Sequence, residues 1–461
     1  MRGSPPANIP NSQIAMKMET SSSSSSSFPI TSKDLPCEII EGILLQLPVK
    51  SLLRFKCVSK SWLNLISDHK FIKSHLHHST KQHPHHDNND GDRISNTHLM
   101  LSSTTLIHSL HLQLPNARTK QEAEAPAAAA PTDADDAVVL ESMVEYPVAS
   151  TVRRPAVKDI KIVGSCNGLL CLVLDFQHMI IYNPSTRHVQ EVPNPEETVI
   201  GRDYFYGFGY DSRNEDCKIV RATSSSRDGN FVTQLDIFTL KTNSWRTKTK
   251  TLPFYFMSSV VGTLLNGALH WAVRRGINIS PSDGDDHDPR LFGIVTFDLI
   301  EETYKEIPLP CDGDKHFSFY GLGVLGGCLS MLHSPHGSDY QVWLMKEYGV
   351  KASWSVFTTI PQKMEDTKEY MGLMSLLCVL KNGEILMMLH NHKKVVIYNP
   401  GQRKFRTIFN WEIGSSQVAL YIETLVSPKI YAPSSSPCIS SRSRADVRNP
   451  EKVRKSLLRP Q

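Results

Sequence analysis

Residues 162–192 have the sequence IVGSCNGLLCLVLDFQHMIIYNPSTRHVQEV, which decides the fold of most of the chain. Asn167-Gly168 lies between two apolar runs, a strong short-range signal for a β-hairpin. A second candidate hairpin follows, with Asn183-Pro184 in its turn. Two successive hairpins of short strands predict one four-stranded antiparallel unit.

The same unit recurs along the chain. Turn residues also separate apolar runs at Asn266-Gly267, Gly326-Gly327 and Asn382-Gly383. In the second hairpins, two large side chains lie seven residues apart, a spacing that puts both on one face as a cross-strand pair. These pairs are Tyr182 with Val189, Phe238 with Trp245, Phe297 with Tyr304, and Tyr398 with Phe405. Trp343 and Trp354 are predicted to form a fifth pair across a longer loop.

Joining the hairpins gives five four-stranded units of the size of propeller blades. They cover residues 160–192, 205–248, 258–308, 320–360 and 372–408. Strand-like segments remain at 98–102, 105–112 and 138–140, and at 418–425 near the other end of the array. We expect these segments to pair into a sixth blade, because such closure removes exposed sheet edges.

Composition excludes several classes of protein. No run approaches the roughly 18 apolar residues of a membrane helix, and no pair of the 9 cysteines has the CxxC spacing of a zinc site. A cytoplasmic or nuclear protein is therefore expected. The net charge of +4 comes from residues 427–461, where eight basic and two acidic side chains give +6 and leave −2 elsewhere. Nucleic-acid binding is not expected; the tail is either an import or anionic-surface signal or simply solvated.

The N-terminal part has a helical pattern. After Leu35-Pro36, apolar residues recur at helical spacing up to Leu47, and Pro48 suits the start of a second helix. A third helix is predicted over residues 59–67, and no helix is expected after it. Three short helices carry more apolar side chains than so small a core can enclose, so a partner surface is implied.

The stretch from residue 35 to residue 71, LPCEIIEGILLQLPVKSLLRFKCVSKSWLNLISDHKF, resembles a plant F-box. The resemblance implies docking to a Skp-like adaptor, and through it to cullin and RING subunits. Trp62 is expected to pack inside. We expect the adaptor-binding residues to be Leu35, Pro36, Ile39, Leu44, Pro48 and Leu52.

Residues 160–426 resemble the F-box-associated domain of plant F-box proteins, which is related to kelch propellers. The segments that carry this likeness include GSCNGLLCL, IIYNPSTR, YGFGYDSRNEDCKIVR, FDLIEETYKEIPLP and VVIYNP. The chain is thus expected to be an α+β multidomain protein, a small three-helix F-box followed by an all-β propeller of six four-stranded blades. The expected divisions are a disordered Ser-rich leader at 1–32, the F-box at 33–77, a linker at 78–97, the propeller at 98–426 with a disordered loop at about 115–136, and a basic disordered tail at 427–461.

The resemblance implies a non-catalytic substrate receptor of an SCF-type (Skp–cullin–F-box) ubiquitin ligase, with an unknown protein target and no cofactor or metal. The histidines between His75 and His86 have no fixed geometry and are interpreted as a solvated linker. Residues in or beside propeller loops are target-binding candidates, each weighed against an ordinary surface role. They are Arg202, Tyr204, Tyr206, Arg227, Arg274, Arg275, His316 and Tyr320.

Two alternatives stay open. A catalytic propeller would need paired carboxylates or metal ligands. Asp211, Asp236 and Asp298 recur near strand ends, but at repeat positions where short polar residues serve turns. The other alternative is an F-box protein that works outside a ligase, as a scaffold or regulator that binds Skp without turnover of a target.

Overall fold

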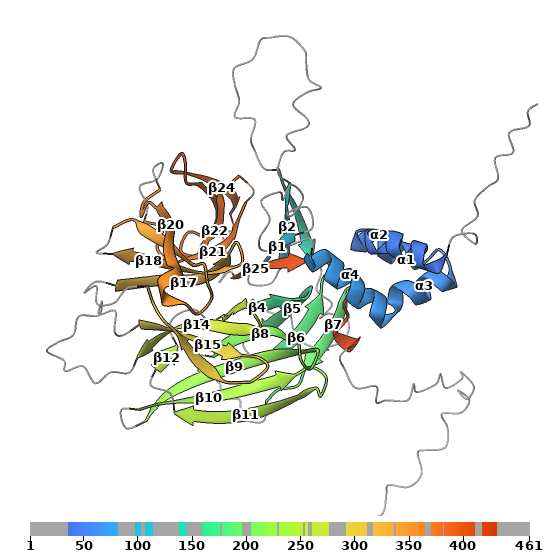
Figure 1. The fold of residues 1–461 in the computed structure, drawn as a ribbon, viewed down its shortest axis with the longest axis horizontal. Helices are drawn as coiled ribbons and strands as arrows, with labels where there is room; N and C mark the ends of the chain where they lie inside the picture. The colour runs from blue at the N-terminus through green and yellow to red at the C-terminus, as the bar shows by residue number, and fades with distance from the viewer. Residues whose placement is uncertain are drawn as a thin grey trace, which may run out of the picture. The chain divides into compact units, whose positions relative to one another are not determined.

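The computed structural model describes residues 36–81, 97–102, 107–113, 138–144, 159–175, 178–195, 204–227, 230–251, 254–256, 261–275, 292–310, 317–335, 338–364, 370–380, 382–410 and 417–430. Along the chain, helices come first and strands follow (Figure 1). None of the helices in these ranges has the length and apolar character that crossing a membrane requires. The predicted leader, the loop at 115–136 and most of the basic tail lie outside the described residues.

The N-terminal region contains four helices, one more than predicted. They are α1 (Cys37–Leu45), α2 (Val49–Phe55), α3 (Lys60–Ser67) and α4 (His69–Lys81). Pro48 directly precedes α2, a position where proline fits the start of a helix. The Ser59 side chain accepts a hydrogen bond from the Trp62 N–H at 3.1 Å and so caps α3.

Helix α4 shows that the prediction of no further helix after the third was wrong. Asp68 Oδ1 accepts hydrogen bonds from the N–H groups of Lys70 and Phe71, at 2.8 and 3.3 Å, and caps the helix start. Phe71 and His75 lie four residues apart on one helix face, and both are buried. His75 Nε2 lies 3.0 Å from the carbonyl oxygen of Leu47. The polar composition of the histidine tract conceals this buried face.

The strands form six antiparallel sheets, which are the blades of a propeller. Blade 1 contains β25 (Gln417–Ile422), β1 (Thr97–Ser102), β2 (Ile107–Gln113) and β3 (Val138–Val144); blade 2 contains β4 (Ile160–Cys166), β5 (Leu169–Leu174), β6 (His178–Asn183) and β7 (His188–Val192); blade 3 contains β8 (Phe205–Asp211), β9 (Asp216–Arg227), β10 (Asn230–Thr239) and β11 (Ser244–Thr251).

The other three blades follow in chain order. Blade 4 contains β12 (Phe254–Phe256), β13 (Thr263–Leu265), β14 (Ala268–Arg275), β15 (Phe292–Asp298) and β16 (Tyr304–Ile307); blade 5 contains β17 (Phe317–Leu325), β18 (Cys328–Pro335), β19 (Tyr340–Met345) and β20 (Trp354–Ile360); blade 6 contains β21 (Met374–Val379), β22 (Ile385–Leu389), β23 (Lys394–Asn399) and β24 (Lys404–Asn410). Blade 4 has five strands, because β12 and β13 both pair with β14.

The predicted closure of the ring is confirmed. Strand β25, from the C-terminal end of the propeller, pairs with β1 from its N-terminal end. The buried side chain of Asn183 in blade 2 locks the segment after β25 in place. Its Nδ2 donates to the carbonyl oxygens of Thr424 and Val426 at 3.0 and 2.5 Å, and its Oδ1 accepts from the Tyr421 hydroxyl at 2.9 Å.

Four of the five predicted cross-strand pairs are confirmed by the strand register. They are Tyr182 opposite Val189, Phe238 opposite Trp245, Phe297 opposite Tyr304, and Tyr398 opposite Phe405. The fifth was wrong, because Trp354 lies opposite Met345 and Trp343 lies opposite Val356. A bulge after Val342 and a 3-10 turn in the longer loop shift this register.

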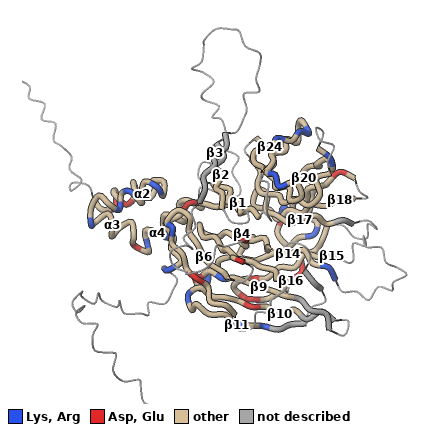
Figure 2. Tube along the Cα trace, turned by 180° about the vertical axis from the view of Figure 1, so that it is seen from behind, with Lys and Arg blue, Asp and Glu red and all other residues tan. Residues whose placement is uncertain are grey.

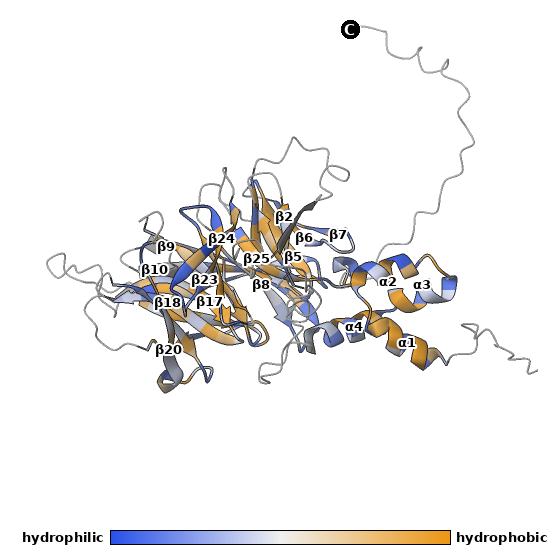
Figure 3. Cartoon of the chain, turned by 90° about the horizontal axis from the view of Figure 1, so that it is seen from above, coloured by the Kyte–Doolittle hydropathy of each residue, from blue (hydrophilic) through white to orange (hydrophobic). Residues whose placement is uncertain are grey.

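Apolar side chains fill the spaces between neighbouring blades. Between blades 3 and 4, Leu269, Trp271 and Phe297 form part of one buried cluster. Gly207 on β8 permits this close approach, because a Cβ there would lie 2.5 Å from Leu269 and 2.9 Å from Trp271. Figure 3 colours many inner-strand positions as hydrophobic. Further buried clusters lie between blades 4 and 5, 5 and 6, 6 and 1, and 1 and 2.

The up-and-down strand order separates the connections of every blade into two ends. We define the turn end as the end that holds the turns between first and second strands and between third and fourth strands. The loop end holds the second-to-third connections and the connections from one blade to the next. Strand β1 begins at Thr97 on the turn end, opposite Ile422. The loop end is therefore the end away from the point where the chain enters the propeller.

Candidate functional site

Aspartates at the turn end build the turns that follow them. Asp211 Oδ1 accepts hydrogen bonds from the N–H groups of Arg213 and Asn214, both at 3.0 Å. Asp298 Oδ1 likewise accepts from the N–H groups of Ile300 and Glu301, at 2.8 and 2.9 Å. The expectation that these two aspartates serve turns is confirmed.

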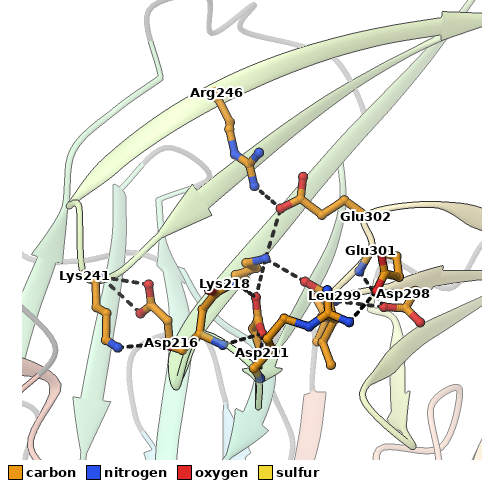
Figure 4. Close-up of polar contacts among 12 residues, drawn as sticks. Asp211, Asp216, Lys218, Lys241, Arg246, Asp298, Leu299, Glu301 and Glu302 are labelled. Carbon is orange, nitrogen blue, oxygen red and sulfur yellow. Dashed lines mark hydrogen bonds and ion pairs between the residues drawn. The ribbon is translucent and has the colours of Figure 1, made fainter.

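Lys218 lies at the centre of a buried ionic network between blades 3 and 4 (Figure 4). Its Nζ lies 2.7 Å from Asp211 Oδ2 and 3.0 Å from Glu302 Oε1, and it donates to the carbonyl oxygen of Leu299 at 2.6 Å. Burial by itself would raise the pKa of Asp211, but hydrogen bonds from Lys218 and Asn214 outweigh it and hold the pKa at about 2. Asp211 is thus ionised and already paired.

Glu302 extends this network to the outer strand of blade 3. Its side chain is 8% exposed and also pairs with Arg246 and with Lys248, whose Nζ lies 2.7 Å from Glu302 Oε2. A general acid needs a raised pKa and a reachable proton, whereas these carboxylates are committed to cations. The network therefore joins two blades. Elsewhere on the described strands, acidic and basic positions are interspersed (Figure 2).

A second buried ion pair lies inside blade 3. The Nε of Arg221 donates to Asp236 Oδ2 at 2.9 Å. The prediction that Asp236 serves a turn was wrong, because it lies within β10 opposite Arg221. The guanidinium of Arg221 also lies 4.3 Å from the ring centroid of Tyr204, one of the predicted target-binding residues. Tyr204 is partly buried by this packing.

Tyr206 is a core residue. It is 7% exposed, burial raises its pKa to about 12, and its carbonyl oxygen accepts from the Gly262 N–H at 2.7 Å. Arg275 is partly buried on β14 and pairs with Glu306 at 2.6 Å. Arg274 precedes it on the same strand and is also partly buried. Of the other predicted residues, Arg202 and His316 lie outside the described residues, and only the backbone of Arg227 is described.

Tyr320 is the predicted residue that lines a cavity. The cavity has a volume of about 200 Å³ and lies among the inner strands at the loop end. Ser375 and His390 also line it, with His390 Nε2 2.7 Å from Ser375 Oγ. Neither was predicted, because Ser375 lies in β21, His390 directly follows β22, and no local motif links them.

Three cysteines of blades 2 and 3 have thiols with raised pKa values. Burial raises the pKa of Cys166 to about 12 and raises those of Cys171 and Cys217 further, so these thiols stay protonated. Among the residues that the structure describes, no group of three or more His, Cys, Asp or Glu side chains is arranged to hold a metal ion.

The residues predicted to bind an adaptor fall into two groups. Pro36, Ile39 and Pro48 are exposed, with Ile39 at 51%. Leu44 and Leu52 are buried, at 1% and 0% exposure. Leu35 lies outside the described residues.

Other apolar side chains on the helices are exposed and were not in the predicted set. They are Ile43 at 51%, Val58 at 63% and Leu63 at 43%. Ile43 follows Ile39 by four residues, so both project from the same face of α1. That spacing was the available signal for Ile43. Much of α1 is coloured hydrophobic in Figure 3, and exposed apolar residues of this density point to an interaction surface.

Comparisons with known proteins agree with this architecture. A family model described as the F-box associated beta propeller domain matches residues 136–437, and the F-box domain model matches residues 33–74. The F-box protein CPR1 of Arabidopsis thaliana is 28% identical over 420 residues, covering 85% of this chain and 88% of that protein. An F-box/kelch-repeat protein of the same plant is 29% identical over 412 residues, covering 86% and 96%. The chain therefore belongs to the plant F-box proteins that carry an F-box associated beta propeller domain.

Proposed function

We propose that this chain is the substrate-receptor subunit of an SCF-type ubiquitin ligase. The observation that carries the proposal is the pairing of an F-box, with exposed Ile39 and Ile43, and a closed propeller in one chain. The F-box would bind a Skp-like adaptor, which connects to the cullin and RING subunits. The propeller would hold the protein target.

Such a subunit acts by proximity. Holding a target beside the ubiquitin-charged enzyme raises the effective concentration of its lysines without any covalent step on the receptor. The pairing of Asp211 and Glu302 with the buried Lys218 supports this non-catalytic role.

The exposed apolar residues refine the adaptor-binding set. We propose that Leu35, Pro36, Ile39 and Pro48 contact the adaptor, together with Ile43. Leu44 and Leu52 are buried, so their contribution would be to the shape of the helices rather than to direct contact.

The test compares two substitutions at exposed positions three residues apart, Ile43→Asp and Gln46→Asp. Each variant of the full chain is mixed with a purified Skp-like adaptor, and the affinity is measured by calorimetry. A charge at Ile43 should weaken adaptor binding at least about 100-fold, because desolvating it at an apolar contact costs several kcal/mol. Gln46→Asp should bind like the wild type. Equal affinity of both variants would remove α1 from the proposed interface.

Recruitment of the cullin distinguishes a ligase subunit from a scaffold that binds the adaptor without turnover of a target. If the chain binds the adaptor but the complex binds no cullin, and no captured protein is ubiquitinated, the ligase proposal fails while the F-box assignment stands.

A further inference from the structure

The cavity at the loop end is built by irregular backbone. Bulges interrupt β4 after Ile162 and β17 after Phe319, and Tyr320 is the extra residue of the second bulge. Bulges redirect side chains and are frequent beside binding sites. The ring of Tyr320 is held edge to face against Tyr340, at 4.8 Å between centroids. Gly321 lets β17 approach β21 closely at the cavity, since a Cβ there would lie 3.0 Å from the Met374 carbonyl oxygen.

The lining of the cavity combines apolar and polar surface. Leu322, Met374 and Val418 contribute apolar surface, whereas Ser375 and His390 form the hydrogen-bonded pair described above. Gln417 lines the same cavity. The Ser375 hydroxyl oxygen has two lone pairs and can accept a hydrogen bond from a ligand in addition to its contact with His390. The lining thus suits an apolar group that carries one O–H or N–H.

The volume sets the size of that group. A cavity of about 150 Å³ accommodates benzene, so the 200 Å³ found here has room for a phenol or an indole ring. Tyrosine and tryptophan side chains combine such a ring with a hydrogen-bond donor that needs a partner when buried.

The surface beside the cavity points to a protein ligand. Leu373, which lines the cavity, is 38% exposed, and the neighbouring Tyr370 is 61% exposed. This segment is braced, because Lys363 Nζ lies 4.6 Å from the Tyr370 ring centroid and His392 Nε2 lies 2.7 Å from the Tyr370 carbonyl oxygen. A free small molecule would fill the cavity and leave both side chains exposed, whereas a protein surface around an inserted side chain would cover them.

We propose that this cavity is the target-binding site of the propeller, and that it takes one tyrosine or tryptophan side chain from an exposed turn of the partner protein, with Tyr370 and Leu373 covered by the surrounding residues. The inference rests on the proposed function for the identity of the partner as a target. The recognition chemistry itself is independent of the F-box.

The first experiment uses N-acetyltryptophanamide, N-acetyltyrosinamide and N-acetylphenylalaninamide as probes of the full chain, with binding followed by ligand-observed NMR. The first two should bind with dissociation constants of about 1 mM, and the phenylalanine probe should bind about fivefold more weakly because it lacks the donor. Ser375→Ala should reduce the discrimination between the tyrosine and phenylalanine probes. Ala419→Phe should abolish binding of all three by filling the cavity. Absence of saturable binding, or binding unchanged in both folded variants, overturns the proposal.

A second experiment separates a protein ligand from a small molecule. Cyclic peptides that display a tyrosine or tryptophan in a turn are selected against the full chain, and their affinity is compared with that of the single-residue probes. The peptides should gain at least about tenfold from the surrounding contacts. Tyr370→Ala should remove that gain, whereas Phe357→Ala, which alters another exposed aromatic residue (42% exposed), should not. If peptides bind no better than the probes, the cavity is not a protein-docking site.

The proposal and the ligase function fail separately. Ile43→Asp should lose the adaptor and keep probe binding, so loss of one activity leaves the other interpretable. A chain that binds probes but no adaptor contradicts the ligase role alone.

Discussion

The two ends of the propeller differ in the side chains that they present. At the turn end, Asp211, Asp298 and Glu302 are paired with backbone N–H groups or buried cations. At the loop end, Tyr370 and Leu373 are exposed beside a cavity. The difference teaches that the ionic network at the turn end holds blades 3 and 4 together, whereas the loop end has the aromatic-lined cavity that we propose binds a partner. Substitutions at the turn end should therefore change stability, while binding of the aromatic probes by the folded protein stays unchanged.

The largest loss of stability is expected from Lys218→Met. It leaves the carboxylate of Asp211, which is 0% exposed, without its cation, and breaking a buried pair in this way costs about 3–5 kcal/mol. Urea unfolding of the full chain measures the change. Adding Asp211→Asn should recover at least about 1 kcal/mol, because it removes the unpaired carboxylate, while Glu302 keeps Arg246 and Lys248 as partners. Unfolding midpoints equal to that of the wild type would show that the network does not join blades 3 and 4.

A smaller loss is expected where the ring closes. Asn183→Ala leaves the carbonyl oxygens of Thr424 and Val426 without their side-chain donor, which should cost about 3 kcal/mol. The matched control is Asn399→Ala in blade 6, whose Nδ2 donates to Glu384 Oε1 at 3.0 Å and is only partly buried. The control should cost about 1 kcal/mol. Equal losses in urea unfolding would contradict a special role for the closure.

The turn end should also weaken in acid through His270. This imidazole is 1% exposed, and its Nε2 lies 2.7 Å from the Tyr348 hydroxyl oxygen of the next blade. Burial lowers its pKa from 6.5 to about 4, so the unfolded chain gains a proton first as the pH falls. This group's contribution should be intact above pH 6.5 and fall by at most about 1.4 kcal/mol per pH unit down to pH 4.

His270→Gln provides the control for this pH dependence. Unfolding free energies of the variant and the wild type are compared at intervals between pH 7 and pH 4.5. The variant should show a shallower decline. Parallel curves would mean that the pKa of His270 is the same in the folded and unfolded chain.

The smallest loss of stability is expected at two tryptophan hydrogen bonds that join outer strands of neighbouring blades. Trp354 Nε1 donates to the Pro308 carbonyl oxygen at 2.8 Å, and Trp245 Nε1 donates to that of Pro193 at 2.5 Å. Trp354→Phe should lower stability by about 1 kcal/mol, and Trp245→Phe by less, because the second bond is exposed to water. Thermal unfolding of the two variants measures these losses. A larger loss for Trp245→Phe than for Trp354→Phe would show that solvent does not weaken the exposed hydrogen bond.

Local spacing predicted most of the fold. The seven-residue intervals and the Asn-Gly turns predicted the hairpins of the blades. The strand-like segments left over at the two ends of the array predicted the blade that closes the ring. Prediction failed where a register depends on something other than spacing, as with the bulge beside Trp343. It also failed for α4, where His75 occupies a position on the buried helix face.

The candidate site was much less predictable. Tyr320, Ser375 and Gln417 come from three blades, and only the closed ring brings them to one cavity. No local motif marks such a set, whereas exposed Ile43 could have been inferred from its four-residue spacing from Ile39.

The most direct test of the ligase role with two separate surfaces is quantitative purification of the full chain from proteasome-inhibited plant extract. Wild type, Ile43→Asp and Ala419→Phe are compared. Ile43→Asp should lose the Skp-like adaptor and cullin but retain the other captured proteins, and Ala419→Phe should do the reverse. A wild-type chain that captures neither adaptor nor cullin, or two folded variants that lose the same partners, would contradict the account.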